Sequence, residues 1–253
     1  MKILILGGTT ESRELASALD LRSDVTVTLS LAGRTANPRP QGVPTRIGGF
    51  GGAEGLARFI AAENIGILID ATHPYADQIS ANAHSAARET GVPFLALRRA
   101  PWQAIPGDRW TCVETVKEAV SGLGSNPVRA FLALGRKNIT PFADAPQHSY
   151  LVRSVDPIDP PLPVRDATYV TARGPFDEAQ DRAMLERYNI EIIVSKNSGG
   201  DASYGKIAAA RALQIPVLMI GRPSLPDAQS VDTVEEALAW CNHALTVAAM
   251  RGV

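Results

Sequence analysis

The sequence predicts an α/β protein made of two three-layer halves with mainly parallel sheets. Short apolar runs alternate with segments of helical apolar spacing along almost all of the 253 residues. The runs are continuously apolar, which is typical of strands covered by helices on both faces. The alternation pauses at about 99–127, where prolines and glycines punctuate the chain. We therefore expect one half at 1–115 and the other at 116–253, with the boundary within 100–128.

Each half has its own series of predicted elements. In the first half, strands are expected at 2–6, 25–31, 65–70 and 93–97, and helices at 11–21, 53–63 and 76–89. In the second half, strands are expected at 129–134, 150–155, 190–195 and 216–221, and helices at 177–188, 204–213 and 234–249. The last helix fits against either half. The proline-rich stretch 156–164 is expected to be a surface connection, because proline breaks both helices and central strands.

Composition excludes several classes of protein. The chain has 25 Lys and Arg against 26 Asp and Glu, and 45% of its residues are hydrophobic. This balance excludes a strongly basic nucleic-acid-binding protein and a disordered chain. Two distant cysteines, Cys112 and Cys241, favour a reducing compartment, and no apolar run is long enough to span a membrane. We expect a cytoplasmic protein that binds neither nucleic acid nor membrane and, because its four histidines are scattered, holds no metal.

A glycine turn follows the first predicted strand. The segment Gly7-Gly8-Thr9-Thr10-Glu11-Ser12 joins that strand to the first helix, but it meets only one of the three glycine positions of the G-x-G-x-x-G pattern. Small hydroxyl residues at the other two positions leave room for a diphosphate at the helix N-terminus. The alternative is a glycine turn with a Thr/Ser helix cap and no ligand.

The end of the second strand favours NADP(H) over NAD(H). An NAD site needs an acidic residue there for the ribose hydroxyls. The sequence instead has Ser30, Gly33, Arg34 and Thr35, which suit a 2′-phosphate because a guanidinium donates to it in a fork. The alternative is a solvated loop arginine.

Two further loops of the first half are candidates for the cofactor site. Glycine-rich residues at 48–52, including Gly49, fit either a ligand-edge loop or a plain connection. The strand at 65–70 continues into Thr72, His73 and Tyr75, which are expected to line a nicotinamide pocket. Thr72 is also a candidate N-cap of the next helix, with Pro74 in its first turn.

Cations recur at the ends of strands in and before the second half. A flat polyanionic substrate would fit such a set, with Trp102 and Phe176 available for its ring. Taken singly, each arginine is better explained as a solvated charge or a surface ion pair, so only the recurrence at strand ends indicates a binding site. The cations are Arg98, Arg99, Arg136, Lys137, Arg173, Lys196 and Arg222.

An ordered series of motifs resembles the precorrin-6A reductase family of cobalamin biosynthesis. The series comprises ILGGTTESRELA (5–16), SLAGRT (30–35), GGFGG (48–52), IDATHPYA (69–76), LRRAPW (97–102), RGPF (173–176), SKNSGG (195–200), KIAAAR (206–211) and IPVLMIGRP (215–223). It runs through nearly the whole chain.

The resemblance implies an NADPH-dependent reduction of one double bond of the precorrin-6A macrocycle, which yields precorrin-6B. It implies two Rossmann-like halves, with the cofactor mainly on the first and the tetrapyrrole in the cleft between them. A cobalt-containing form of the substrate and direct handover to neighbouring pathway enzymes are both compatible with it. The cofactor residues implied are Gly8, Thr9, Thr10, Ser30, Gly33, Arg34 and the region of Gly49, and the candidate cofactor set is completed by Glu11, Thr72 and His73.

For the substrate, the resemblance gives the seven strand-end cations a role, because precorrin-6A carries many carboxylates. Ser198 and Gly199 join that set, since they follow Lys196 in the same turn. The proton donor is open among Lys196, Asp201, His73, Tyr75 and solvent, with Lys196 preferred.

Two alternatives remain from the sequence. One is an NADP(H)-dependent reductase of another polyanion, although the Tyr-x-x-x-Lys pair of short-chain dehydrogenases is missing: Tyr204 is followed by Lys206. The other is a non-catalytic NADP(H)-sensing module, which would have no need for so many cations at strand ends.

Overall fold

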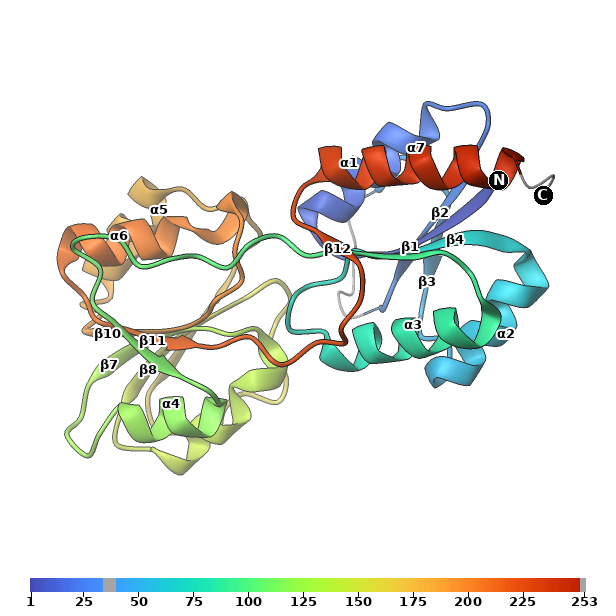
Figure 1. Cartoon of the computed structure of the whole chain (residues 1–253). Coiled ribbons are helices and arrows are strands. Elements are labelled where there is room, and N and C mark those ends of the chain that lie inside the picture. Colours follow the sequence, from blue (N-terminus) through green and yellow to red (C-terminus); the bar gives the residue numbers. More distant parts are fainter. Residues whose placement is uncertain (34–39, 251–253) are drawn as a thin grey trace. The chain divides into compact units, whose positions relative to one another are not determined.

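The computed structural model describes residues 1–33 and 40–250, and the chain forms two compact units (Figure 1). Unit 1 comprises Met1–Ala100 and Pro223–Val253, and unit 2 comprises Pro101–Arg222. Each unit contains one sheet of six strands, every one paired in parallel with its neighbours. The predicted fold class is thereby confirmed.

The sheet of unit 1 has the order β12-β5-β4-β1-β2-β3. Its strands are β1 (Lys2–Leu6), β2 (Thr26–Leu31), β3 (Thr45–Ile47), β4 (Ile65–Asp70), β5 (Phe94–Leu97) and β12 (Ser230–Val231). The chain moves outward from β1 to β2 and β3, then returns to β4 on the other side of β1. The carboxyl ends of β1 and β4 therefore flank the topological switch point, where open α/β sheets bind their ligands.

In the described part of unit 1, four helices cover this sheet. Figure 1 shows α1 (Thr10–Asp20) and α7 (Val234–Met250) on one face and α2 (Gly52–Glu63) and α3 (Asp77–Thr90) on the other. Alternate residues of β1 serve the two faces: Ile3 and Ile5 join the cluster that contains α1 and α7, whereas Leu4 and Leu6 join the cluster that contains α2 and α3. The continuous apolar run therefore reflects burial on both sides.

Unit 2 repeats the plan with the order β6-β11-β10-β7-β8-β9. Its strands are β6 (Trp110–Val113), β7 (Arg129–Ala133), β8 (Ser149–Ser154), β9 (Ala167–Thr171), β10 (Ile192–Lys196) and β11 (Val217–Ile220). Figure 1 shows α5 (Glu178–Arg187) and α6 (Gly205–Leu213) on one face and α4 (Val116–Gly122) on the other. Three short 3-10 helices lie at Arg136–Asn138, Thr140–Asp144 and Asp201–Ser203.

The division of the chain differs from the predicted 1–115 and 116–253. The chain leaves unit 1 after β5, and β6 joins the sheet of unit 2 beside β11. It returns after β11, because β12 pairs with β5 and α7 packs on the sheet of unit 1 through Ala237 and Cys241. Pairing between distant segments, which local sequence patterns do not encode, decides this exchange.

The prediction that strands and helices stop alternating at about 99–127 is wrong, because this stretch contains β6 and α4. Strands β3, β9 and β12 were also missed. All of these elements except α4 are strands at or near sheet edges, and the middle residues of β6 are exposed, so they lack a continuous apolar run. The proline-rich stretch 156–164 does form an irregular connection, between β8 and β9.

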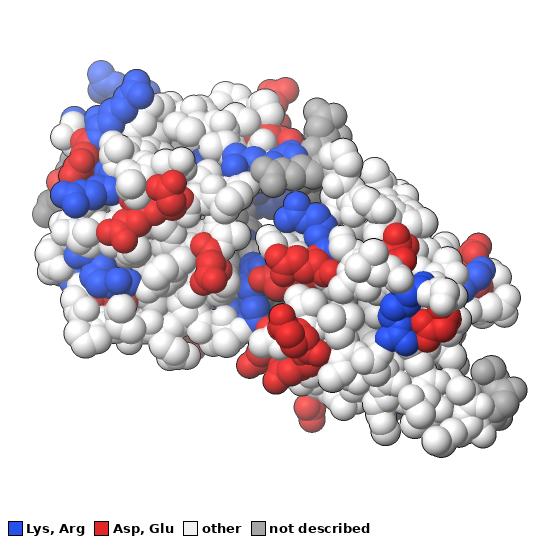
Figure 2. Space-filling model, turned by 90° about the horizontal axis from the view of Figure 1, so that it is seen from above, with Lys and Arg blue, Asp and Glu red and all other residues white. Residues whose placement is uncertain are grey.

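Charges of both signs are mixed on the face of the molecule that Figure 2 draws. Figure 2 shows Lys and Arg interspersed with Asp and Glu among many uncharged side chains on the face that it draws, in keeping with a net charge of −1. Within residues 1–33 and 40–250, none of the helices is both long enough and apolar enough to cross a membrane.

We predict that Tyr150 makes stability fall at high pH. Its side chain is buried and its hydroxyl donates to the Ala145 carbonyl at 2.7 Å, and burial raises the pKa of Tyr150 to about 12. In the unfolded chain the phenol ionises near pH 10, as in model peptides. Its contribution is therefore complete below about pH 10 and is lost as pH rises toward about 12, because the unfolded state then binds fewer protons.

The check is denaturant unfolding of wild type and Tyr150→Phe between pH 8 and pH 12. The variant should be less stable by about 1–2 kcal/mol at pH 8, because the Ala145 carbonyl loses its donor. The difference between the two proteins should shrink above pH 10. A difference that is constant with pH would contradict the assignment.

Candidate functional site

The turn between β1 and α1 is built for close packing. A Cβ on Gly7 would lie 2.6 Å from Leu29 Cδ1 and 2.9 Å from Ser12 Oγ, so only glycine fits between the helix and β2. Gly8 has φ +123°, which side-chain-bearing residues rarely adopt. The two glycines let the chain turn directly from β1 into α1, and the N-terminus of α1 is thereby brought to the switch point.

Thr9 and Ser12 cap α1 reciprocally. The Ser12 N–H donates to Thr9 Oγ1 at 3.1 Å, and Ser12 Oγ accepts from the N–H groups of Gly8 and Thr9, both at 3.1 Å. Thr9 Oγ1 also donates to the Ala71 carbonyl at 2.9 Å, which ties the turn after β1 to the loop after β4. The predicted Thr/Ser cap is confirmed. The cap occupies the backbone N–H groups of Gly8, Thr9 and Ser12. A diphosphate at this end of the helix would therefore meet the backbone N–H groups of Thr10 and Glu11.

The loop after β4 is held by a buried carboxylate. Asp70 is 2% exposed, and its Oδ1 accepts from the Thr72 N–H at 3.1 Å and the Thr72 hydroxyl at 2.7 Å. The alternative in which Thr72 caps the next helix is wrong, because α3 begins at Asp77 with Ala76 as N-cap. Beyond Thr72, the Tyr75 N–H donates to His73 Nδ1 at 3.2 Å, and the rings of these two residues lie 5.7 Å apart.

Arg46 is a residue of the site that sequence reasoning missed. It lies on β3 and donates to the Gly49 carbonyl at 2.8 Å, and its guanidinium carbon stands 3.9 Å from the centre of the Phe50 ring. The same loop is held from α2, where a Cβ on Gly55 would lie 1.7 Å from the Phe50 carbonyl oxygen. No sequence signal identified Arg46, because β3 itself is too short and exposed to be predicted.

The end of β2 lies beside the end of β1. Ser30 is 5% exposed, and its carbonyl accepts from the Gly7 N–H at 2.9 Å, which holds the ends of β1 and β2 together. Gly33 follows with φ +70°. Arg34 and Thr35 lie outside the described residues, so their predicted contacts with a 2′-phosphate stay a prediction from the sequence.

Arg98 and Arg99, predicted as substrate residues, belong to unit 1. Arg99 donates to the Glu11 carboxylate at 2.8 Å, with the two side chains only 15% and 21% exposed. Both terminal nitrogens of Arg98 donate to the Pro226 carbonyl at 3.2 Å. The structure therefore brings Arg99 to the N-terminus of α1, among the cofactor candidates.

The remaining predicted cations share one edge of the unit 2 sheet. Because all six strands are parallel, the residues that end or follow β7, β9, β10 and β11 lie at its carboxyl edge. Ser198 and Gly199 lie in the loop after β10, and the exposed Asp201 begins the short helix that follows. The cations at this edge are Arg136, Lys137, Arg173, Lys196 and Arg222.

The loop after β10 is fastened to Trp102 by Asn197. The Asn197 side chain accepts from the Trp102 N–H at 2.8 Å and donates to the Trp102 carbonyl at 3.0 Å. The Trp102 indole N–H donates to the Gly200 carbonyl at 2.9 Å, and Lys206 Nζ stands 4.7 Å from the ring centre. Sequence reasoning named Trp102 as a ring platform but missed Asn197 and the buried Lys206, whose ammonium donates to the Ser203 carbonyl at 2.6 Å.

Arg222 and Phe176 support this edge from within. Arg222 donates to the carbonyls of Asn197 at 3.0 Å and Ser198 at 3.2 Å, so its guanidinium braces the loop after β10. Phe176 packs against the guanidinium of Arg153, whose carbon lies 3.7 Å from the ring centre. Arg153 is itself buried and paired with Asp181. One face of Phe176 is thus occupied by a side chain of its own unit.

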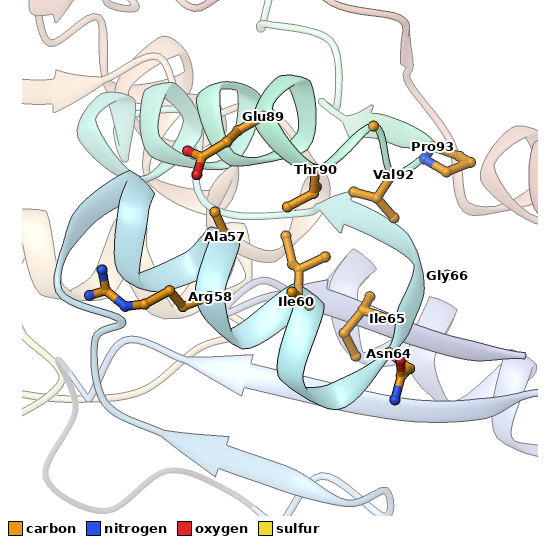
Figure 3. Close-up of a pocket in the computed structure, with 12 residues that line it drawn as sticks. Ala57, Arg58, Ile60, Asn64, Ile65, Gly66, Glu89, Thr90, Val92 and Pro93 are labelled. Atoms are coloured by element: carbon orange, nitrogen blue, oxygen red, sulfur yellow. The ribbon is translucent and has the colours of Figure 1, made fainter.

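A pocket of about 610 Å³ lies elsewhere in unit 1 (Figure 3). It is lined by Ile60 and Asn64 at the end of α2, Thr90 at the end of α3, and Ile65 and Pro93, which stand at the starts of β4 and β5. This is the amino edge of the sheet, opposite the switch point. None of the predicted site residues lines it.

The fold and the strand-end loops define a two-unit α/β protein of the Rossmann type, with a glycine turn at the switch point of unit 1 and cations along the carboxyl edge of unit 2. A family model described as precorrin-6x reductase CbiJ/CobK matches residues 2–242. The chain belongs to this family, which makes it an oxidoreductase.

Individual relatives agree with the family model over the whole chain. A precorrin-6A reductase of Sinorhizobium sp is 56% identical over 249 residues, which are 98% of this chain and 95% of the relative. One of Rhodobacter capsulatus is 46% identical, covering 97% of this chain and 98% of the relative. A solved structure named CobK precorrin-6A reductase superposes with a TM-score of 0.93 at 45% identity, covering 96% of this chain and 97% of that one.

We predict that Asn197→Ala destabilises unit 2. The substitution removes both side-chain hydrogen bonds to Trp102, so the loss should be about 1–3 kcal/mol. Denaturant unfolding measures it, with Asn126→Ala as the matched control. Asn126 is an exposed residue of unit 2 that precedes β7, and its loss should change stability by less than about 0.5 kcal/mol. Equal effects of the two substitutions would contradict a fastening role for Asn197.

Proposed function

We propose that this protein uses NADPH to reduce one double bond of the precorrin-6A macrocycle and releases precorrin-6B. The observation that carries the proposal is the match to precorrin-6A reductases over nearly the whole chain, at up to 56% identity among the relatives described above. The family places the chain among the oxidoreductases of cobalamin biosynthesis. The carboxyl edges of the two sheets supply groups that suit the two reactants.

For the cofactor, the proposal assigns the carboxyl edge of unit 1. The N-terminus of α1 offers backbone N–H groups and the positive end of a helix dipole to a diphosphate. The loops after β3 and β4 begin at the same edge of the sheet, and Arg46, Asp70 and the Thr9–Ala71 hydrogen bond hold them in place. When bound, the reduced nicotinamide supplies the hydride. The residues assigned are Gly8, Thr9, Thr10, Ser30, Gly33, Arg34, Gly49, Thr72 and His73, and Glu11 through its backbone N–H alone.

For the substrate, the proposal assigns the carboxyl edge of unit 2. The macrocycle carries acetate and propionate carboxylates, and guanidinium and ammonium groups bind carboxylates through charge-assisted hydrogen bonds. We assign such bonds to Arg136, Lys137, Arg173 and Lys196, with Ser198 and Gly199 in the loop after β10. Arg222 is assigned an indirect role, because its guanidinium donates to the Asn197 and Ser198 carbonyls and so positions the loop after β10.

Reduction of a double bond also requires a proton. Lys196, at the end of β10, is the donor we prefer, and Asp201 lies five residues further along the same connection. In unit 1, His73 Nδ1 accepts from the Tyr75 N–H, so a neutral His73 carries its proton on Nε2 and can donate from there. Tyr75 completes the set of candidates. From its protonated form, each of these groups can deliver a proton to a carbanionic centre.

The cobalt-free substrate is favoured over its cobalt complex. The relatives named precorrin-6A reductase are 40–56% identical to this chain, whereas a cobalt-precorrin-6A reductase of Priestia megaterium is 30% identical over 96% of this chain and 97% of its own length. This difference in identity supports the cobalt-free substrate.

The function is tested by anaerobic oxidation of NADPH, followed by its near-ultraviolet absorbance, with and without enzymatically prepared precorrin-6A. Oxidation should require both the protein and the tetrapyrrole, and the product should have gained two hydrogens by mass spectrometry. Tight binding of NADPH without any turnover would leave the cofactor assignment in place and remove the substrate assignment.

Arg34→Ala tests the choice of nucleotide. Loss of charge-assisted hydrogen bonds to the 2′-phosphate should weaken NADPH binding about 10- to 100-fold and leave NADH binding nearly unchanged. Fluorescence titration with both dinucleotides measures this. Equal losses for NADPH and NADH would refute the assignment of Arg34 to the 2′-phosphate.

Arg173→Ala tests the substrate edge. Arg173 is exposed after β9, and its loss should raise KM for precorrin-6A about 10-fold with little change in KM for NADPH. Arg109→Ala is the matched control, because Arg109 precedes β6 at the opposite edge of the same sheet. A defect confined to NADPH, or an equal defect in the control, would remove Arg173 from the substrate site.

A further inference from the structure

An ion pair joins Glu11 and Arg99 at the N-terminus of α1. Glu11 lies in the first helical turn, and Arg99 Nη1 stands 2.8 Å from its Oε2. The two side chains are 15% and 21% exposed, so solvent screens them less than it screens the surface pair of Lys2 and Glu63, whose side chains are 49% and 52% exposed. The attraction between these two charges is therefore screened less than that of an exposed pair, and it contributes to the electrostatic potential at this end of α1.

Its place in the sheet puts the pair at the switch point. In the order β5-β4-β1, Arg99 follows β5 and Glu11 follows β1, so the pair bridges the carboxyl end of β4. The Thr9 hydroxyl donates to the Ala71 carbonyl and links the turn after β1 to the loop after β4 at the same place. A diphosphate at the N-terminus of α1 would lie beside the Glu11 carboxylate.

That carboxylate has opposite effects on the free helix and on a bound dinucleotide. In the free protein, an acidic side chain in the first turn is stabilised by the positive end of the helix dipole. Toward a diphosphate at the same end it is a like charge, and like charges at close range oppose binding. A cation that stays on Glu11 removes this repulsion.

We propose that Arg99 is a positioning residue for the cofactor that acts through Glu11: it neutralises the carboxylate so that the N-terminus of α1 accepts a diphosphate. This proposal rests on the dinucleotide site proposed above, and it replaces the assignment of Arg99 to the tetrapyrrole. Since NADPH and NADH share the diphosphate, Arg99 supports both, whereas Arg34 is assigned to the 2′-phosphate that only NADPH carries.

The experiment is a double-mutant cycle on dinucleotide binding. Arg99→Ala, Glu11→Gln and the double variant are titrated with NADPH and NADH, without tetrapyrrole, at 50 mM and 500 mM salt. Arg99→Ala should weaken both dinucleotides at least 10-fold at low salt and less at high salt. Glu11→Gln should bind at least as well as wild type, and the double variant should return to within about 3-fold of it.

Lys2→Ala serves as the matched control. It also removes one positive charge from an ion pair of unit 1, but Lys2 begins β1 at the amino edge of the sheet. Its dinucleotide affinity should equal that of wild type. Thermal unfolding of all variants shows whether any loss of binding reflects loss of fold, and the rescue by Glu11→Gln distinguishes charge compensation from a structural role.

Several results would overturn the proposal. Unchanged dinucleotide affinity in Arg99→Ala, or a loss that the double variant does not relieve, would refute the action through Glu11 while the cofactor site itself stands. Unchanged dinucleotide affinity of Arg99→Ala, together with a raised KM for precorrin-6A in a separate turnover assay, would return Arg99 to the substrate. Failure of the folded wild type to bind either dinucleotide would instead refute the proposed function, and this inference with it.

Discussion

Parallel pairing of every strand is the constraint on which the rest of this structure depends. It brings all carboxyl ends of a sheet to one edge, so loops that are far apart in the chain share a surface. In unit 1 this edge collects the glycine turn and the loops after β2, β3 and β4. In unit 2 it collects four cation-bearing strand ends. Each edge is polar because the backbone groups of its loops are not paired within the sheet. Side chains donate hydrogen bonds to loop carbonyls there, as Arg46 and Arg222 do.

Those side chains come mostly from outside the loops that they hold. Arg46 on β3 fixes the Gly49 carbonyl, and Arg222 after β11 braces the Asn197 and Ser198 carbonyls. Asn197 in turn binds both backbone groups of Trp102, which lies 95 positions earlier in the chain. The loops are thereby ordered before any ligand arrives, and this reduces the entropy that binding must overcome.

Membership of the precorrin-6x reductase family and the geometry of the two edges support one another. The proposed reduction of a carboxylated macrocycle needs a dinucleotide site and a cationic surface, and we assign one to the carboxyl edge of each sheet. The structure also shows that two of the predicted substrate cations belong to unit 1. Arg98 and Arg99 follow the last long strand of unit 1 and bind within that unit, to Pro226 and Glu11, so the cations left for a polyanion lie at the edge of unit 2.

The sequence alone determined the fold class, the long buried strands, the Thr/Ser cap of α1 and the family, because these depend on local periodicity and on motifs in a fixed order. Only the tertiary structure decided the exchange that puts β6 in unit 2 and β12 and α7 in unit 1, since short edge strands carry little apolar signal. The same holds for the partners of charged and polar side chains. Glu11 and Arg99 are 88 positions apart, and Arg153 and Asp181 are 28 apart. No local pattern specifies such pairs, because they form only when the sheet has assembled and brought its strand ends together.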